Sequence, residues 1–188
     1  IETLPGTVSD RANKKISFLR QPKILSQRII AHVLHPSDHI ILMSTLDKDG
    51  ILTLDTVENT VLTDTRFGHS FIVGLLNSKL WSWYAYSFIF SKAIRTMDFD
   101  DYYLGKFPVP SIDFDNPTDK EMHDDLVALV DKMLELNKKL KALSHFEAEH
   151  RQALEKEIEH VDKTIDGLVY KLYDLTGDEI EIVESRQS

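Results

Sequence analysis

Leucine spacing in the second half of the chain is the feature that most limits the fold. Apolar residues recur three and four positions apart in two runs, Leu126–Leu143 and Leu154–Leu175. This heptad spacing predicts two helices, each with a single apolar seam. A short polar break at Ser144–His150 separates the runs. We therefore expect the helices to fold back on each other as an antiparallel, coiled-coil-like hairpin.

The first part of the chain shows a different pattern. Four runs rich in β-branched and other apolar residues predict strands, at residues 23–34, 39–46, 51–55 and 60–63. Gly50 ends a polar turn in which a positive φ suits glycine. Apolar positions within Phe71–Phe90 follow helical spacing, and a polar, irregular stretch follows at residues 91–103. The expected fold class is α+β: a small mixed or antiparallel sheet with packed helices, followed by the hairpin.

Local sequence also predicts where the helices begin and end. His69 or Ser70 is expected to cap the apolar helix of the first part. Thr118 or Asp119 is expected to cap the first helix of the hairpin. Gly177 is expected to end the second helix.

Charge and pattern both divide the chain into two expected domains, residues 1–117 and residues 118–188. The net charge is −9. Residues 1–95 carry 11 Lys and Arg against 8 Asp and Glu, a charge of +3, whereas residues 96–188 carry 11 against 23, a charge of −12. The first part therefore tolerates a polyanion and the second repels it. We expect the second domain, a helical hairpin with a short C-terminal tail, to act as a spacer or docking element.

The composition narrows the class of protein. The chain contains no cysteine, which excludes disulfides and cysteine-ligated metals and fits a cytoplasmic location. The sequence begins with Ile1 and shows no signal peptide, so we interpret it as a piece of a longer protein. Lys79 lies in the middle of the most apolar window, which favours a buried helix over a membrane span. No membrane association is expected.

Motifs for catalysis are missing from the sequence. It has no Walker loop, no GxGxxG and no nucleophile elbow. The spacing of His32, His35 and His39 suggests a metal site, but the first two would point to opposite faces of a strand. Asp47–Lys48 resembles part of a restriction-nuclease core, for which Asp38 is the convenient second carboxylate. A small metal nuclease is thus an alternative, but we expect the chain itself to be non-catalytic, without a metal or cofactor.

Basic and amide side chains of the first part are the candidates for contact with nucleic acid. Arg pairs with guanine and Gln with adenine in the major groove, whereas Lys mainly serves phosphates. Scattered Lys and Arg are also typical of any solvated surface, which is the alternative explanation. The candidates flank the first strand, the turn, the apolar helix and the loop after it: Lys23, Gln27, Arg28, Lys48, Arg66, Lys92 and Arg95.

Four stretches carry a family resemblance through their order along the chain: PKILSQRI, FIVGLLNSKLWSWYAY, YYLGKFPVPSID and IDGLVYKLYDLTGDEIEIVE. The second contains Leu75–Ser78, the third contains Pro108 and Pro110, and the fourth runs from Ile165 past Ile180. In this order they resemble the TaqI-like C-terminal specificity domain. That domain is the target-recognition domain of Type IIG restriction–modification enzymes and related adenine-specific DNA methyltransferases.

The resemblance implies that residues 1–117 form an α/β domain that reads double-stranded DNA, and that the hairpin joins it to the rest of an enzyme. In such enzymes a Rossmann-like methyltransferase domain binds S-adenosylmethionine, and a nuclease domain, where present, uses Mg²⁺. Both cofactors would belong to domains of the same parent chain. Base-reading positions are not carried over from the family, so the candidate contacts rest on charge and loop placement.

Other functions stay open at this point. Half of a Type I restriction specificity subunit also joins a recognition domain to long helices. A helical-hairpin module would bind protein and not DNA. Because heptad seams close within one chain or between chains, a dimer through the helices is open as well.

Overall fold

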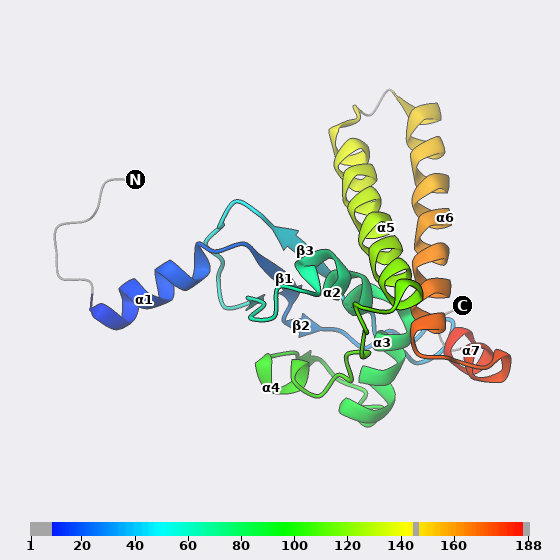
Figure 1. The fold of residues 1–188 in the computed structure, drawn as a ribbon, viewed down its shortest axis with the longest axis horizontal. Coiled ribbons are helices and arrows are strands. Elements are labelled where there is room, and N and C mark those ends of the chain that lie inside the picture. Colours follow the sequence, from blue (N-terminus) through cyan, green and yellow to red (C-terminus); the bar gives the residue numbers. More distant parts are fainter. Residues whose placement is uncertain (1–8, 145–146, 186–188) are drawn as a thin grey trace.

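The computed structural model describes residues 9–144 and 147–185 (Figure 1). The helices are α1 (Asp10–Leu19), α2 (Gly68–Asn77), α3 (Lys79–Tyr84), the π-helical turn η1 (Ala85–Ile89), α4 (Asp101–Leu104), α5 (Pro117–Ala142), α6 (Ala148–Leu172) and α7 (Gly177–Glu184). The strands are β1 (Lys23–Gln27), β2 (Ile29–Ile30), β3 (Ser44–Asp47), β4 (Val57–Thr60) and β5 (Met97–Asp98). The α+β class is confirmed.

Two small antiparallel sheets adjoin each other along the chain. Strand β1 is the middle strand of the first sheet, whose order is β3-β1-β4, with Ile24 opposite Leu46 on one side and Thr60 on the other. Strand β2 begins one residue after β1 and pairs with β5, with Ile30 opposite Met97. Because only one residue separates β1 from β2, the second sheet is held directly beside the first.

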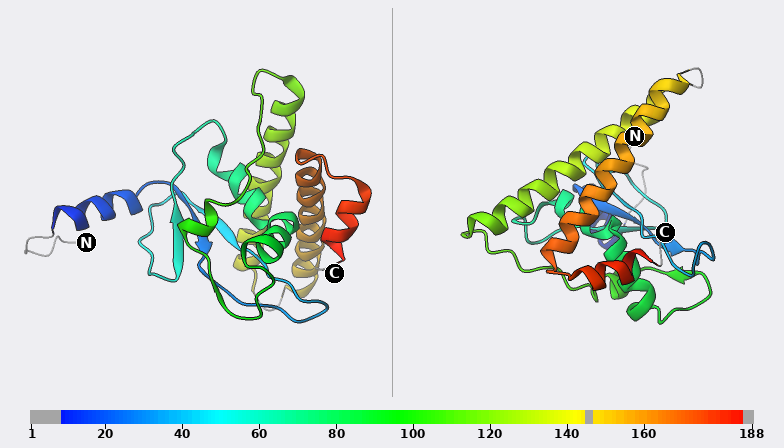
Figure 2. Two further views of the ribbon diagram at one scale, coloured as in Figure 1. Left: turned by 90° about the horizontal axis from the view of Figure 1, so that it is seen from below. Right: turned by 90° about the vertical axis from the view of Figure 1, so that its right-hand side faces the viewer.

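The core lies where α2 packs between the first sheet and the hairpin. Helix α2 is apolar on nearly every side, and seven of its residues from Ser70 to Leu76 are buried. Its Gly74 lies so close to α5 that an added Cβ would meet Val130 Cγ2 at 2.9 Å and Leu126 Cδ1 at 3.0 Å. Helices α5 and α6 run side by side as a hairpin (Figure 2), as the heptad spacing predicts.

One cluster of buried apolar side chains extends across the predicted domain boundary. It joins Phe71 of α2 to Leu126 of α5 and Ile165 of α6. Helix α5 begins at Pro117, the last residue of the first predicted domain. Assigning recognition to one side of it and docking to the other stays a prediction. Among the described residues, none of the helices is both long enough and apolar enough to span a bilayer.

The predicted strands in the turn region were partly wrong. Residues 51–55 form no strand, β4 ends where the fourth predicted strand was to begin, and β3 begins only at Ser44. The reason is a buried ion pair. The Ile51 N–H donates to Asp47 Oδ2 at 2.8 Å, and the Ile51 carbonyl accepts from Lys23 Nζ at 2.9 Å. These side chains take the place of a neighbouring strand, and Leu54 is left 83% exposed. The turn itself is confirmed, with Gly50 at φ +69°.

The long apolar helix is interrupted, which the sequence pattern did not predict. Ser78 has an extended conformation, with ψ 151°, and separates α2 from α3. Neither His69 nor Ser70 caps α2. Its N-cap is Phe67, without a side-chain bond, and the Ser70 hydroxyl instead donates to Asp131 at 2.7 Å. The stretch at residues 91–103, predicted to be irregular, contains β5 and most of α4.

The predicted ends of the hairpin helices also need correction. Asn116, and not Thr118 or Asp119, caps α5: its Oδ1 accepts from the Thr118 N–H at 2.9 Å, and a proline occupies the first helical position. Helix α6 ends at Leu172, ahead of Gly177, which is the first residue of α7. A capping box between Thr176 and Glu179 starts α7 there, so the glycine begins a helix that the sequence analysis did not predict.

Candidate nucleic-acid interface

Residues that carry the family resemblance form a polar network between the first sheet, α3 and the C-terminal helices. Asn77, at the end of α2, binds the backbone of Ser44 twice: its Oδ1 accepts from the Ser44 N–H at 2.7 Å, and its Nδ2 donates to the Ser44 carbonyl at 2.9 Å. The Ser78 hydroxyl then caps α3 by accepting from the Trp81 N–H at 3.2 Å. This short segment therefore fixes both the sheet and the start of the next helix.

The same segment holds the C-terminal helices. The Lys79 backbone N–H donates to Asp166 Oδ1 of α6 at 2.9 Å, and Lys79 Nζ lies 2.6 Å from Glu184 Oε2 of α7. Glu184 Oε1 accepts from the Tyr170 hydroxyl at 2.8 Å. Burial raises the pKa of Asp166 to about 6, and burial also raises the pKa of Tyr170. Burial opposes ionisation of Glu184, but its hydrogen bonds from Lys79 and Tyr170 hold its pKa below the usual value.

A second set of contacts joins the proline-containing connection to helix α3 and to Tyr173 at the end of α6. The Trp81 indole N–H donates to the Tyr173 hydroxyl at 2.8 Å, and that hydroxyl donates to the Pro108 carbonyl at 2.7 Å. The Trp81 ring stacks on Phe107, with centroids 4.4 Å apart. The resemblance residues at 77–81, 107–108 and 166–184 thus hold the architecture together, and the surface available to a ligand lies elsewhere.

Of the predicted DNA contacts, Lys23 is fully buried. Its Nζ pairs with Asp47 and donates to the Leu19 carbonyl at 2.5 Å. Burial opposes ionisation of Asp47, yet hydrogen bonds from Lys23 and from the N–H groups of Asp49 and Ile51 hold its pKa below the usual value. Lys23 therefore anchors the turn, and the structure gives it no surface to present to DNA.

Gln27 and Arg28 lie at the junction between the two sheets. Gln27 is exposed, and its Nε2 donates to the Ile29 carbonyl at 2.7 Å. Arg28 forms a fork with Asp98 of β5, Nε to Oδ1 at 2.7 Å and Nη2 to Oδ2 at 3.3 Å. This hydrogen bonding raises the pKa of Arg28 and lowers that of Asp98. The Arg28 side chain is thus held in place at the sheet edge and remains about one third exposed.

Lys92 and Arg95 are both exposed in the loop that leads from η1 into β5. Neither forms an ion pair with any residue of the described ranges. Ser91 and Lys92 have φ values of 51° and 58°, in the left-handed region. The loop joins β5 two residues after Arg95, so pairing of β5 with β2 brings it toward Arg28. The structure therefore groups these three predicted residues around one small sheet.

Lys48 and Arg66 lie apart from that group. Lys48 is exposed in the turn after β3, where an added Cβ on Gly50 would collide with the Arg20 carbonyl at the end of α1. Arg66 precedes α2 and binds Asp64, with Nη2 2.6 Å from Oδ2. These hydrogen bonds lower the pKa of Asp64 to about 2. The seven predicted residues therefore do not form one continuous site.

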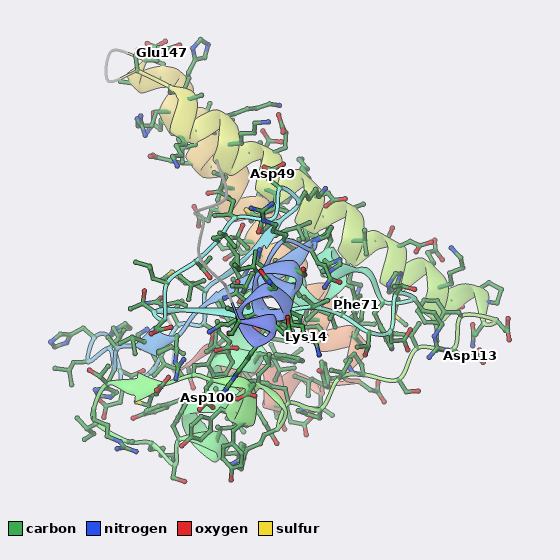
Figure 3. All side chains as sticks on the ribbon, turned by 90° about the vertical axis from the view of Figure 1, so that its left-hand side faces the viewer. Lys14, Asp49, Phe71, Asp100, Asp113 and Glu147 are labelled. Atoms are coloured by element: carbon green, nitrogen blue, oxygen red, sulfur yellow. The ribbon has the colours of Figure 1, made fainter. Side chains whose placement is uncertain are left out.

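Other exposed basic residues of the first 117 positions were not among the predicted contacts. Lys106 Nζ lies 4.1 Å from the centre of the exposed Tyr102 ring, just after α4. Helix α1, which no expected element covered, carries Arg11, Lys14 and Lys15. The signal was present, because these three are spaced three and four apart, as on one face of a helix. Figure 3 looks at the molecule from this side, with Lys14 on the nearest helix.

The histidines that suggested a metal have other partners. His32 Nε2 lies 3.4 Å from Asp38 Oδ1, and its ring stacks on Tyr86 with centroids 5.7 Å apart. His39 Nδ1 lies 2.7 Å from the Ser37 carbonyl oxygen. Within residues 9–144 and 147–185, no three His, Asp or Glu side chains come together as metal ligands.

Comparison with known proteins identifies the family. No curated protein and no solved structure matches the chain. The family described as the TaqI-like C-terminal specificity domain matches residues 7–109. This stretch contains helix α1, both sheets and all seven predicted contact residues, and ends before α5. Because the match covers more than half of the chain, the chain belongs to the family of TaqI-like C-terminal specificity domains.

Proposed function

We propose that the chain is the DNA target-recognition module of a Type IIG restriction–modification enzyme. Membership of the specificity-domain family supports DNA sequence recognition in restriction–modification. Residues 1–95 have a net charge of +3, whereas residues 96–188, which include the hairpin, have a net charge of −12. Duplex DNA would therefore approach the sheet side and be repelled by the hairpin.

The observation that carries the proposal is the pairing of β2 with β5. It places Arg28 at one end of a short ladder and the Lys92–Arg95 loop at the other. At about 3.3 Å per strand residue, the backbones of Arg28 and Arg95 lie roughly 13 Å apart along the ladder, close to the major-groove width of about 12 Å. Asp98 holds the Arg28 guanidinium through Nε and Nη2, and the Nη1 hydrogens with the second Nη2 hydrogen would make the bidentate contact to a guanine edge. Lys92 and Arg95 would serve phosphates or base edges.

The remaining candidates contribute differently to the proposed interface. Gln27, next to Arg28 and exposed, would reach adenine. Lys48 and Arg66 lie apart from this group and would contact only the backbone of a longer duplex. Lys23 is left out because it is buried.

The hairpin would join the recognition domain to catalytic domains of the same parent chain. A methyltransferase domain there would bind S-adenosylmethionine, and a nuclease domain would use Mg²⁺. Because the polar network around Lys79 fixes α6 and α7 on α3, the hairpin would hold the reader at a constant orientation. Such an enzyme would act in the cytoplasm, where its DNA lies.

Selection from a pool of duplexes with randomised central base pairs tests the proposal. The chain should enrich a short common sequence, and the variant Arg28→Ala/Lys92→Ala/Arg95→Ala should lose or relax it. The control is Lys138→Ala/Lys139→Ala/Lys141→Ala, which removes the same charge from exposed positions at the far end of α5. If the unmodified chain enriches no sequence, the proposal is wrong. Unchanged enrichment by the first variant would remove those three residues from the interface.

A further inference from the structure

Helix α1 has a basic face that the proposed interface does not use. Lys14 and Lys15 lie three and four positions after Arg11, the spacing of neighbours on a helix face, and all three side chains are exposed. The one acidic residue in the helix is Asp10, at its first position, where a carboxylate also suits the helix dipole. Within the described residues, none of the three cations forms an ion pair. The face is therefore free to meet an external anion.

The placement of α1 gives it no role in the core. It has no buried residue, and it extends away from the body of the protein at the end opposite α7 (Figures 1 and 2). Its apolar positions Ala12, Ile16 and Leu19 are spaced four and three apart and are only half-buried. The cations lie on the neighbouring face. A helix that contributes nothing to the core but presents three unpaired cations is suited to binding.

Helix α1 also adjoins the proposed DNA interface. A groove of about 210 Å³ separates it from β4, and Lys15 and Arg28 both line this groove. Asp55 and Glu58 line it as well, so the groove itself is not basic, and Arg11 and Lys14 lie outside it. Lys15 of α1 therefore lies beside Arg28, one of the residues proposed to read bases, and Lys14 precedes Lys15 on the same helix.

We propose that α1 contacts the phosphate backbone of the same duplex, a step that rests on the proposed function. From Arg11 to Lys15 the helix rises only about 6 Å, so three cations meet a short run of phosphates. Such contacts set register and strengthen binding without reading sequence. The occupant is thus duplex DNA, and an α1 variant that binds the duplex like the unmodified chain would leave an acidic protein surface as the rival occupant.

The test compares the salt dependence of duplex binding for the chain and for Arg11→Ala/Lys14→Ala/Lys15→Ala, by fluorescence anisotropy with a labelled duplex. Each lost phosphate contact removes about 0.9 from the slope of log K against log salt, or about 2.7 for three. Over a fourfold rise in salt, the variant should lose about 40-fold less affinity than the unmodified chain. The sequence enriched from the randomised pool should stay the same.

The Lys138→Ala/Lys139→Ala/Lys141→Ala variant is the matched control, because it changes the net charge equally. It should keep the full salt slope. An α1 variant with unchanged slope and affinity, or a control that loses as much, overturns the role of α1 while the proposed function stands. A chain that binds no duplex at all overturns both. Because α1 buries nothing, the variant should unfold at the temperature of the unmodified chain, so lost binding is not lost folding.

Discussion

Replacing Asp166 with Asn should remove a pH-dependent part of the protein's stability. The Asp166 side chain is 6% exposed and lies close to Asp162 and Glu184, and Lys79 Nζ is 3.8 Å from its Oδ2. Burial raises its pKa from 3.8 to about 6. Between those values the folded protein keeps a proton that the unfolded chain has released. Stability therefore falls as the pH rises through this range.

The size of the effect follows from the shift. At about 1.4 kcal/mol per pKa unit, the full contribution is about 3 kcal/mol. Between pH 4 and pH 8, titration of Asp166 should lower the free energy of unfolding by about 2.5 kcal/mol, and roughly 1.4 kcal/mol of this loss should occur above pH 5. Asn has no proton to release, and its amide oxygen still accepts from the Lys79 N–H. The variant should therefore gain stability relative to the unmodified chain as the pH rises, by these amounts.

Urea denaturation of both proteins at several pH values, followed by circular dichroism, measures the difference. Asp162 is present in both, so its own titration largely cancels. Asp125→Asn, which removes an exposed carboxylate from α5, is the control and should show no comparable trend. A difference between Asp166→Asn and the unmodified chain that is constant from pH 5 to pH 8 would refute the argument from burial.

Three further substitutions test the packing. Tyr173→Phe leaves the buried Trp81 N–H without its acceptor and should cost about 1–3 kcal/mol of unfolding free energy in urea titrations. Gly74→Ala forces α2 away from α5 and should cost about 1–3 kcal/mol, visible as a lower Tm. Lys23→Met leaves Asp47 charged and buried and should cost about 3–5 kcal/mol, whereas a stability close to the unmodified chain would mean that Asp47 finds another partner.

The hairpin could be predicted from sequence because its signal is periodic and repeated. Each of α5 and α6 displays its seam over many turns, so a single irregular residue does not hide it. The strands failed because their partners are distant. Whether Ile51 pairs with a strand depends on Lys23, which is 28 residues away and occupies its carbonyl. The alternation of apolar and polar residues at 51–55 contains no sign of this distant hydrogen bond.

The candidate site was predictable in type but not in arrangement. Basic residues of the first part were identified from charge, and the structure groups Arg28, Lys92 and Arg95 around β2 and β5. It also buries Lys23 and separates Arg66, because charge in a sequence says nothing of burial or distance. Helix α1 was missed for another reason: its ten residues hold too short an apolar pattern to stand out.

The bond from Asp166 to the start of α3 has a consequence for how such modules are exchanged. The stretch shared with the family ends at residue 109, but the carboxylate that completes α3 comes from α6. In a hybrid protein that contained only the shared stretch, the Lys79 N–H at the start of α3 would lose its acceptor Asp166. Gly74 would lose its packing partners Leu126 and Val130 of α5. Under the proposed function, specificity would therefore be transferred from one enzyme to another only when α5 and α6 are transferred together with residues 7–109.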